Sequence, residues 1–262
     1  MTPAAAARAA ALLLEARRAR RPLERLPEDC RPASLAEGYA IQEALVAQCG
    51  SPAVGFKIGA TSEKAQRFLG IDTPFSGHIL AAGVQDSPAS LAVGRFNFCL
   101  VEPEFAFRLA DPLPPREQPY DEATVAEAVA SLHPAVEVVT SAYGAGWSKA
   151  GGPALVADNG VHGAFVLGPA CRDWRRLDLA GHRVTLAQNG QPVGEGVGGN
   201  ALGGPLTALT WLVNQQRSLG RTLEAGQLVT TGVVTDFVLA AAGDEMLADY
   251  GALGRVELRF TA

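Results

Sequence analysis

The segment "CLVEPEFAFRLADP" (residues 99–112) places two glutamates, Glu102 and Glu104, in a largely apolar run. The run predicts a β-strand, and side chains two residues apart lie on the same face of a strand. Both carboxylates therefore point to one side. Two like charges in apolar surroundings repel each other and are costly to remove from water. If this strand is buried, the fold needs positive charge on that face.

A third carboxylate poses the same problem. Glu137 lies in "LHPAVEVVTS", a second strand candidate, between Val136 and Val138. A divalent cation would offset the cost directly, because hard cations such as Mg²⁺ bind a few carboxylates together with water and substrate oxygens. The alternative is a pair of half-exposed strands with solvated glutamates, a common arrangement on sheet surfaces. The apolar flanks of all three glutamates favour a metal site formed by Glu102, Glu104 and Glu137.

Composition narrows the class of protein. The 262 residues are 48% hydrophobic and 19% charged, which suits one large domain, or one domain with a small appendage. The net charge of −5 offers no basic excess for nucleic acid, and no apolar run of about 18 residues predicts a membrane span. The four cysteines form no CxxC pair, which favours free thiols in a reducing, cytoplasmic setting over disulfides or structural zinc.

Helical patterns dominate the first part of the chain, and strand patterns dominate the rest. Residues 1–21 predict a first helix rather than a targeting segment, and Ser34 with Glu37 forms a capping box for a second. Further helices are predicted at 62–70, 121–132 and 205–220, strands at 51–62, 96–110, 133–141, 163–169, 228–234, 244–251 and 254–260, and a hairpin at Asn189-Gly190. The expected organisation is α+β, with a small helical N-terminal region (1–50) joined to a larger mixed β domain (51–262).

The same segments, taken in order, resemble one known family. The chain is similar to the 2-keto-4-pentenoate hydratase and 4-oxalocrotonate decarboxylase group of the fumarylacetoacetate hydrolase superfamily. The resemblance covers nearly the whole chain and rests on "GFKIGATS", "QRFLGID", "VEPEFAF", "HPAVEVV", "VADNG", "GNALGGPLTALTWLVNQ", "LEAGQLVTTGVV" and "AAGDEMLADYGALGRVELRF". It implies a fumarylacetoacetate-hydrolase-like mixed β-roll, a Mg²⁺ or Mn²⁺ ion on the three glutamates, and a small 2-oxo acid as substrate.

The resemblance also assigns residues by motif position. It matches the lysine of the family's "KIG" segment to Lys57, an acid–amide pair to Asp158 and Asn159, and a threonine before a late glycine to Thr231. Lys57 lies in an apolar, glycine-punctuated segment and is the best candidate for a charged group near the substrate; without the resemblance, an exposed lysine at a strand end is nearly as good an interpretation. Asp158-Asn159-Gly160 alone would be an ordinary turn, and Thr231 an ordinary strand residue. The expected roles are catalysis for Lys57 and Asp158, and substrate binding for Asn159 and Thr231.

Two histidines complete the expected site. His162 follows the Asp-Asn turn and precedes a strand, so it is the preferred general acid or base, and His78 is the second choice, for substrate binding. For each histidine the alternative is a structural or exposed position. The chain departs from the family pattern at Phe75-Ser76, where an acidic residue is expected, with only Asp72 nearby, and at "GVHG", where a small hydroxylic residue is expected after the Asp-Asn pair.

The resemblance implies a lyase that hydrates a 2-hydroxy-2,4-dienoate to a 4-hydroxy-2-oxo acid in the catabolism of aromatic compounds. Alternatives are decarboxylation of a substrate such as 4-oxalocrotonate, with Arg108 or Lys149 as a further cation, and hydrolysis of an acylpyruvate. A non-catalytic partner subunit is the alternative outside enzymes. The expected partners are further copies of the chain in a homo-oligomer, and possible association with a related decarboxylase or hydratase.

Overall fold

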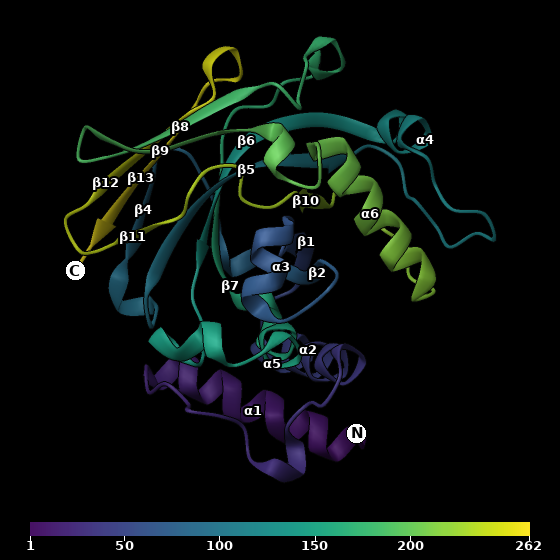
Figure 1. Cartoon of the computed structure of the whole chain (residues 1–262), viewed down its shortest axis with the longest axis vertical. Coiled ribbons are helices and arrows are strands. Elements are labelled where there is room, and N and C mark those ends of the chain that lie inside the picture. Colours follow the sequence, from purple (N-terminus) through teal and green to yellow (C-terminus); the bar gives the residue numbers. More distant parts are fainter.

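The computed structural model describes all 262 residues as two β-sheets flanked by helices (Figure 1). The α-helices are α1 (Pro3–Ala19), α2 (Leu35–Cys49), α3 (Glu63–Leu69), α4 (Glu122–Glu127), α5 (Gly152–Ala157) and α6 (Pro205–Ser218). The strands are β1 (Ala53–Gly59), β2 (Phe75–Leu80), β3 (Val84–Asp86), β4 (Ala89–Ala92), β5 (Cys99–Leu109), β6 (Val129–Val139), β7 (His162–Leu167), β8 (Arg183–Gln188), β9 (Gln191–Val197), β10 (Leu228–Thr230), β11 (Val238–Ala240), β12 (Glu245–Asp249) and β13 (Arg255–Thr261). None of the helices is both long and apolar enough to cross a membrane.

The larger sheet carries the predicted metal site at its centre. Its strand order is β2-β1-β10-β5-β6-β7-β3, and β11 pairs with one end of β5. The sheet is mixed, because β1 runs parallel to β10 and β3 parallel to β7, while the other pairs are antiparallel. The register of β5 against β6 places Glu102 directly opposite Glu137. The smaller sheet has the order β4-β13-β12-β8-β9.

The two faces of β5 differ in chemistry. Phe105 and Phe107 are fully buried in the main hydrophobic cluster, which takes side chains from both sheets and from α6. Removing such side chains from water stabilises the fold by about 1.5–3 kcal/mol each. Alternate positions on the other face carry Glu102 and Glu104. The pleat of β5 thus separates an aromatic core from a polar site.

The N-terminal helices form a layer at one end of the larger sheet, shown at the bottom of Figure 1. α1 and α2 share a second hydrophobic cluster with α5 and with residues that follow β6, among them Leu13, Ile41, Leu155 and Val161. Residues 1–50 therefore bury their apolar side chains against residues 100–161. The boundary at residue 50 stays a prediction.

Local signals in the sequence are confirmed in several places. Ser34 caps α2 by accepting from the amide of Glu37, whose own carboxylate accepts from Ala33 N at 2.7 Å. Asn189 and Gly190 both have positive φ, +53° and +76°, and join β8 to β9 in the predicted hairpin. Two-residue hairpin turns of this kind require φ > 0 at both positions.

Other local predictions were wrong or incomplete. The helix expected over residues 121–132 ends at Glu127, because the chain from Val129 onward pairs with β5 and lengthens β6. Strand β2 was not predicted, since its "FSGHIL" carries no alternation. It forms because it pairs antiparallel with β1 along its whole length. In both cases pairing with a distant strand decides the local structure.

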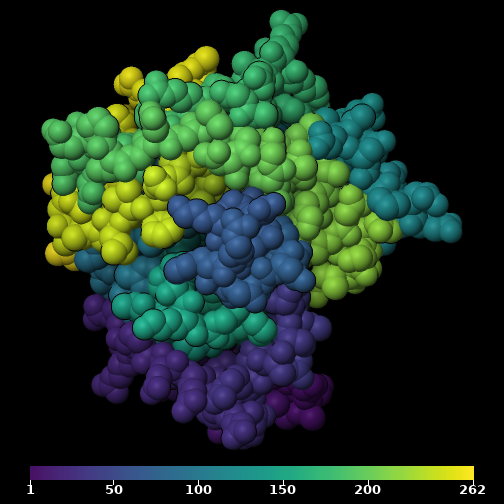
Figure 2. Space-filling model, in the orientation of Figure 1, coloured from purple at the N-terminus to yellow at the C-terminus, as the bar shows by residue number.

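Helix α3 stands at the surface directly after β1. None of its residues is buried, and Phe68 is 61% exposed. Its ring meets Trp147 edge-on with 6.2 Å between ring centroids. In Figure 2 this part of the chain is the blue lobe that projects between the yellow C-terminal segments and the teal residues around 150. Helix α3, which follows the strand β1 that carries Lys57, thus buries little apolar surface against the rest of the protein.

Tyr250 links the two sheets, and its hydroxyl offers a test of the fold. The hydroxyl lies 2.9 Å from the carbonyl oxygen of Glu104 and 2.6 Å from that of Ala135, which face each other across β5 and β6. We expect Tyr250→Phe to lower the free energy of unfolding by about 1–3 kcal/mol, because buried carbonyls lose a donor. Urea unfolding measures the loss. Tyr120→Phe, whose hydroxyl meets only the carbonyl of Pro114, is the control and should lose less; equal losses would contradict this assignment.

Candidate metal centre

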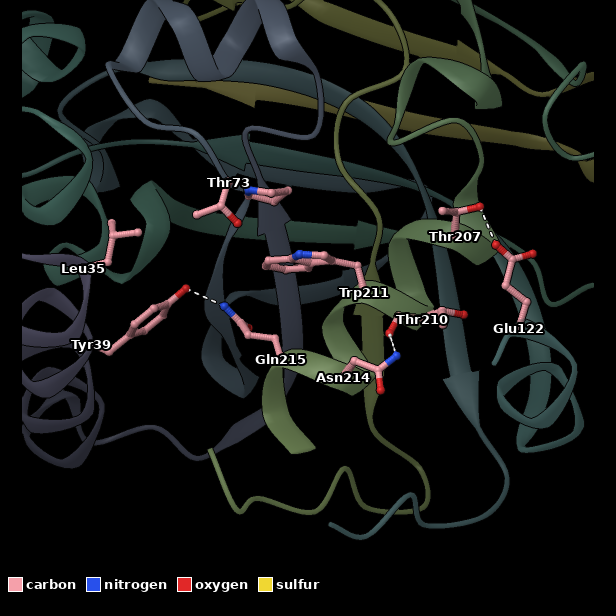
Figure 3. A pocket seen from close by; sticks show the side chains of 10 residues that line it. Leu35, Tyr39, Thr73, Glu122, Thr207, Thr210, Trp211, Asn214 and Gln215 are labelled. Atoms are coloured by element: carbon pink, nitrogen blue, oxygen red, sulfur yellow. Dashed lines mark hydrogen bonds between the residues drawn. The ribbon is translucent and has the colours of Figure 1, made fainter. Parts of the chain in front are cut away.

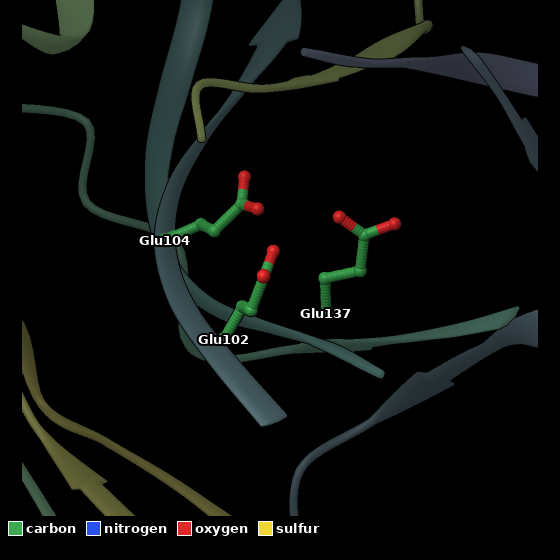
Figure 4. Close-up of side chains that lie close together, drawn as sticks. All are labelled: Glu102, Glu104 and Glu137. Carbon is green, nitrogen blue, oxygen red and sulfur yellow. The ribbon is translucent and has the colours of Figure 1, made fainter. Parts of the chain in front are cut away.

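Three carboxylates meet at the centre of the larger sheet (Figure 4). Glu102 and Glu104 project from one face of β5, and Glu137 projects from β6 beside them. One oxygen from each lies within 4.8 Å of the others. Glu104 and Glu137 are fully buried, while Glu102 is half-buried. The expectation that these three side chains meet is confirmed; that they bind a metal stays a prediction at this point.

A single buried cation faces the three carboxylates. Lys57 on β1 is 2% exposed, and its Nζ lies 3.1 Å from Glu137 Oε2. One ammonium against three carboxylates leaves the cluster with an excess of negative charge when all are ionised. Oε1 of Glu104 is buried and has no hydrogen-bond partner. A donor set of carboxylate oxygens with an unpartnered oxygen fits a hard divalent cation.

The pKa values report the same imbalance. Burial raises the pKa of Glu102 to about 7 and that of Glu104 well above its ordinary value. For Glu137, burial is outweighed by Lys57 and His162, which lower its pKa. For Lys57, burial is likewise outweighed by the carboxylates, led by Glu137, and the pKa rises. Burial thus favours the uncharged form of both carboxyl groups in the metal-free centre, and a bound cation would favour the ionised form.

The backbone after β10 holds Glu104 in place. Its Oε2 accepts from the amide of Gly232 at 2.7 Å and from the hydroxyl of Thr230. The predicted Thr231 instead donates its hydroxyl to the carbonyl of Phe105 at 3.1 Å, on the other face. The threonine hydroxyl that contacts the cluster is thus that of Thr230, which sequence reasoning missed. Pairing of Thr230 with Lys57 across β1 and β10 would have identified it, but no sequence signal gives that register.

His162 joins the cluster through Glu137. Its Nδ1 lies 2.8 Å from Glu137 Oε1, and the ring is buried. With Glu137 ionised, Nδ1 carries the hydrogen and donates a hydrogen bond to the carboxylate. Nε2 is buried without a partner. Glu137 is therefore contacted on one oxygen by Lys57 and on the other by His162.

The remaining predicted residues are buried, but the structure does not bring their side chains to the glutamates. Asp158 accepts from Arg17, Ser141 and Ala142. The amide of Asn159 bonds the backbone N and O of His78 at 2.7 and 2.9 Å. The imidazole of His78 turns to Glu43, 3.0 Å away, and packs on Phe56. Their assigned roles remain predictions without a direct contact to the cluster.

Two further expectations concern charged and apolar neighbours. The Phe75 ring is fully buried, with its centroid 5.9 Å from Lys57 Nζ, so the departure from the family pattern lies at the site itself.

Arg108 and Lys149, proposed as further cations, lie elsewhere: Arg108 bonds the carbonyl of Gly226, and Lys149 is exposed. Neither contacts the glutamates.

A separate groove of about 530 Å³ lies between α2 and α6 (Figure 3). Tyr39, Trp211 and Gln215 are among the residues that line it. Polar groups in the groove bond one another, as in the hydrogen bond from the Gln215 amide to the Tyr39 hydroxyl at 2.7 Å. None of the predicted site residues lines this groove. The chemistry therefore concentrates at the carboxylate cluster.

Comparison with known proteins places the chain in a family. Residues 85–261 match the family model described as "Fumarylacetoacetate (FAA) hydrolase C-terminal". A 2-keto-4-pentenoate hydratase from Paraburkholderia xenovorans (strain LB400) is 31% identical over 99% of this chain and 96% of its own length. A 2-hydroxyhexa-2,4-dienoate hydratase from Comamonas testosteroni is 30% identical over 95% of each chain.

Among solved structures, the 4-oxalocrotonate decarboxylase from Pseudomonas putida G7, complexed with magnesium and adipate, superposes with a TM-score of 0.91 at 25% identity. The alignment covers 99% of this chain and 98% of the decarboxylase. The two-sheet architecture, the α+β class and the full-length matches agree with one another. The chain belongs to the fumarylacetoacetate hydrolase family.

Proposed function

We propose that this protein is a metal-dependent hydratase that converts a 2-hydroxy-2,4-dienoate to a 4-hydroxy-2-oxo acid in aromatic-compound catabolism. The observation that carries the proposal is the buried cluster of three carboxylates joined to Lys57, in a chain similar along almost its whole length to 2-keto-4-pentenoate hydratases. The reaction type follows the relatives, and the cluster supplies the chemistry that this reaction needs.

Glu102, Glu104 and Glu137 would hold Mg²⁺, or Mn²⁺, in this proposal. A divalent cation held there would supply a Lewis acid for a 2-oxo acid and would stabilise negative charge on its keto oxygen. Thr230 and Gly232 donate hydrogen bonds to the carboxylate of Glu104, and His162 and Lys57 contact that of Glu137. Such outer contacts orient ligands and preserve their basicity.

Lys57 is proposed to contact the substrate's carboxylate or enolate oxygen with its ammonium. The group is buried, so its interaction with an oxyanion is stronger than it would be in water. His162 donates a hydrogen bond from Nδ1 to Glu137, and this leaves the unpartnered Nε2 as an acceptor for a proton. Roles for Asp158 in catalysis and for His78, Asn159 and Thr231 in substrate binding remain proposals from the family pattern.

The second candidate is decarboxylation of a substrate such as 4-oxalocrotonate. The close superposition on the 4-oxalocrotonate decarboxylase favours it. The positions of Arg108 and Lys149, away from the cluster, weigh against it, because the distal carboxylate of that substrate calls for a cation. Acylpyruvate hydrolysis and a non-catalytic partner subunit are further alternatives. The intact Lys57 and glutamates disfavour the last.

The deciding experiment supplies Mg²⁺-loaded protein with 2-hydroxypenta-2,4-dienoate, 4-oxalocrotonate and acetylpyruvate in parallel. Loss of dienoate absorbance without CO₂ release is the expected result. CO₂ release from 4-oxalocrotonate would assign decarboxylation, and pyruvate from acetylpyruvate would assign hydrolysis. Silence on all three would leave two alternatives, a substrate outside this set or a non-catalytic partner subunit. Light scattering on the same sample tests the proposed homo-oligomer, and a cytoplasmic location stays a prediction.

Magnesium is expected to stabilise the metal-free protein. At a Mg²⁺ concentration of 100 times Kd, mass action adds about 2.7 kcal/mol to the free energy of unfolding, which raises Tm by roughly 5–10 °C for a chain of this size. Thermal unfolding with EDTA, then with added Mg²⁺, measures the shift. Glu137→Gln removes one proposed ligand and should lose most of the shift. An unchanged Tm in the wild-type protein would contradict the metal site.

A further inference from the structure

We propose that Arg17, on the N-terminal helix α1, is a positioning residue that holds His162 and Glu137 in their working geometry. The inference rests on the proposed metal centre and hydratase function and deepens them. The proposal makes α1 part of the support of the metal centre, although this helix lies outside the larger sheet, at the bottom of Figure 1. The connection runs through Asp158.

The guanidinium of Arg17 reaches four acceptors in a distant part of the chain. Nε donates to Asp158 Oδ1 at 2.6 Å, and Nη1 donates to the carbonyl of His162 at 2.7 Å. Nη2 donates to the carbonyls of Asp158 at 2.9 Å and Thr140 at 3.3 Å. Only the planar fork of an arginine can serve several acceptors in this way. The arginine side chain is 19% exposed, and that of Asp158 is not exposed.

Both carboxylate oxygens of Asp158 take part in this support. Its Oδ1 accepts from Arg17, while Oδ2 accepts from Ser141 Oγ and from Ala142 N, each at 2.8 Å. Ser141 and Ala142 lie two and three residues after the end of β6, the strand that carries Glu137. The carboxylate thereby ties α1 to the end of that strand.

The backbone just before His162 needs such support. Asn159, Gly160 and Val161 have φ of +54°, +60° and +60°, so three consecutive residues lie in the left-handed region. For a β-branched residue such as Val161 this conformation is strained, and it persists only where surrounding contacts fix it. Arg17 bonds the carbonyls of Asp158 and His162, one on each side of this segment.

The strand pairing next to His162 is irregular as well. The register of β6 against β7 shifts between Val138 and Val139, so that Val138 faces Ala164 while Val139 faces His162. Bulges of this kind redirect side chains near functional sites. Here the redirected imidazole reaches Glu137 at 2.8 Å. The bond from Arg17 to the His162 carbonyl holds the chain at this irregularity.

The test replaces Arg17 with methionine and compares it with Arg18→Met, an exposed arginine in the same helical turn. Both variants are first checked for a cooperative thermal transition above the assay temperature. Mg²⁺ binding to the metal-free proteins is then measured by calorimetry, and kcat and KM for the dienoate are measured at saturating Mg²⁺. We expect Arg17→Met to weaken Mg²⁺ binding and kcat by about 10–100-fold, the effect of removing the support of a ligand. KM should change little, and Arg18→Met should match the wild type.

A purely structural role would lower Tm and leave Mg²⁺ affinity and kcat unchanged, and that result would overturn the proposal. Should Arg17→Met fail to fold, Arg17→Lys carries the same comparison, because lysine keeps the charge beside Asp158 but lacks the fork. Weaker Mg²⁺ binding by folded Arg17→Lys supports the proposal, and wild-type binding overturns it. The calorimetry needs no substrate, so it decides the role of Arg17 even if the hydratase assay fails.

Discussion

Replacing Glu104 with glutamine should abolish turnover while the protein stays folded. Glutamine keeps the shape of the side chain, and its amide oxygen can still accept from Gly232 or Thr230. Burial raises the pKa of Glu104 well above its ordinary value, so the metal-free protein already favours an uncharged group there. The neutral amide should therefore cost little stability. As a ligand, however, glutamine lacks the negative charge that ionised Glu104 would offer to the proposed cation.

The expected loss in kcat is roughly 10³-fold, equivalent to about 4 kcal/mol of transition-state stabilisation. Steady-state kinetics at high Mg²⁺ and urea unfolding in EDTA measure the two parts separately. Glu257→Gln, the same change at an exposed position of β13, is the control. Activity of Glu104→Gln near that of the control would remove the carboxylate cluster from the mechanism.

The central part of this site followed from elementary patterns. The period of two along a strand placed Glu102 and Glu104 on one face, and the cost of burying like charges called for a cation. Glu137 was included because it too interrupts an apolar strand. These arguments need no knowledge of which strands pair. The prediction that the three side chains meet succeeded because β5 and β6 are long, buried strands.

The surroundings of the cluster could not be obtained in this way. The choice between Thr230 and Thr231 depends on the register of β10 against β1, and a slip of one residue exchanges the two faces. The contact of Arg17 with Asp158 joins residues 141 positions apart, and no local pattern encodes it. The same holds for the turn of His78 toward Glu43. Long-range packing decides these contacts, so a motif can identify a residue without telling which way its side chain points.

Replacing Lys57 with methionine should impair both stability and turnover. Magnesium should restore the stability but not the turnover. The ammonium is the single cation within ion-pair distance of the buried cluster. Removing one partner of a buried ion pair leaves the other uncompensated and typically costs about 3–5 kcal/mol. In the variant, Glu137 loses the main influence that lowers its pKa. Burial then raises that pKa, as it does for Glu102 and Glu104.

The sign of the pH dependence follows from these shifts. In the wild type, the lowered pKa of Glu137 contributes stability above the ordinary glutamate pKa, and this contribution is lost as pH falls through the folded value. In Lys57→Met the raised pKa reverses the sign, so stability is kept at low pH and lost as pH rises. The difference in unfolding free energy between the two proteins should therefore widen as pH rises from 4.5 toward 8. Urea unfolding in EDTA across this range measures it.

Magnesium separates the two roles proposed for Lys57. A bound cation would neutralise the carboxylates, so Mg²⁺ should recover most of the lost stability at pH 8. It should not recover turnover, because the ammonium is also proposed to contact the substrate, and kcat should remain lower by about 10²–10³-fold. Lys64→Met, at an exposed lysine on α3, is the control for the substitution itself. If Mg²⁺ restored stability and kcat together, Lys57 would serve only to balance charge in the metal-free protein, and its contact with the substrate would have to be abandoned.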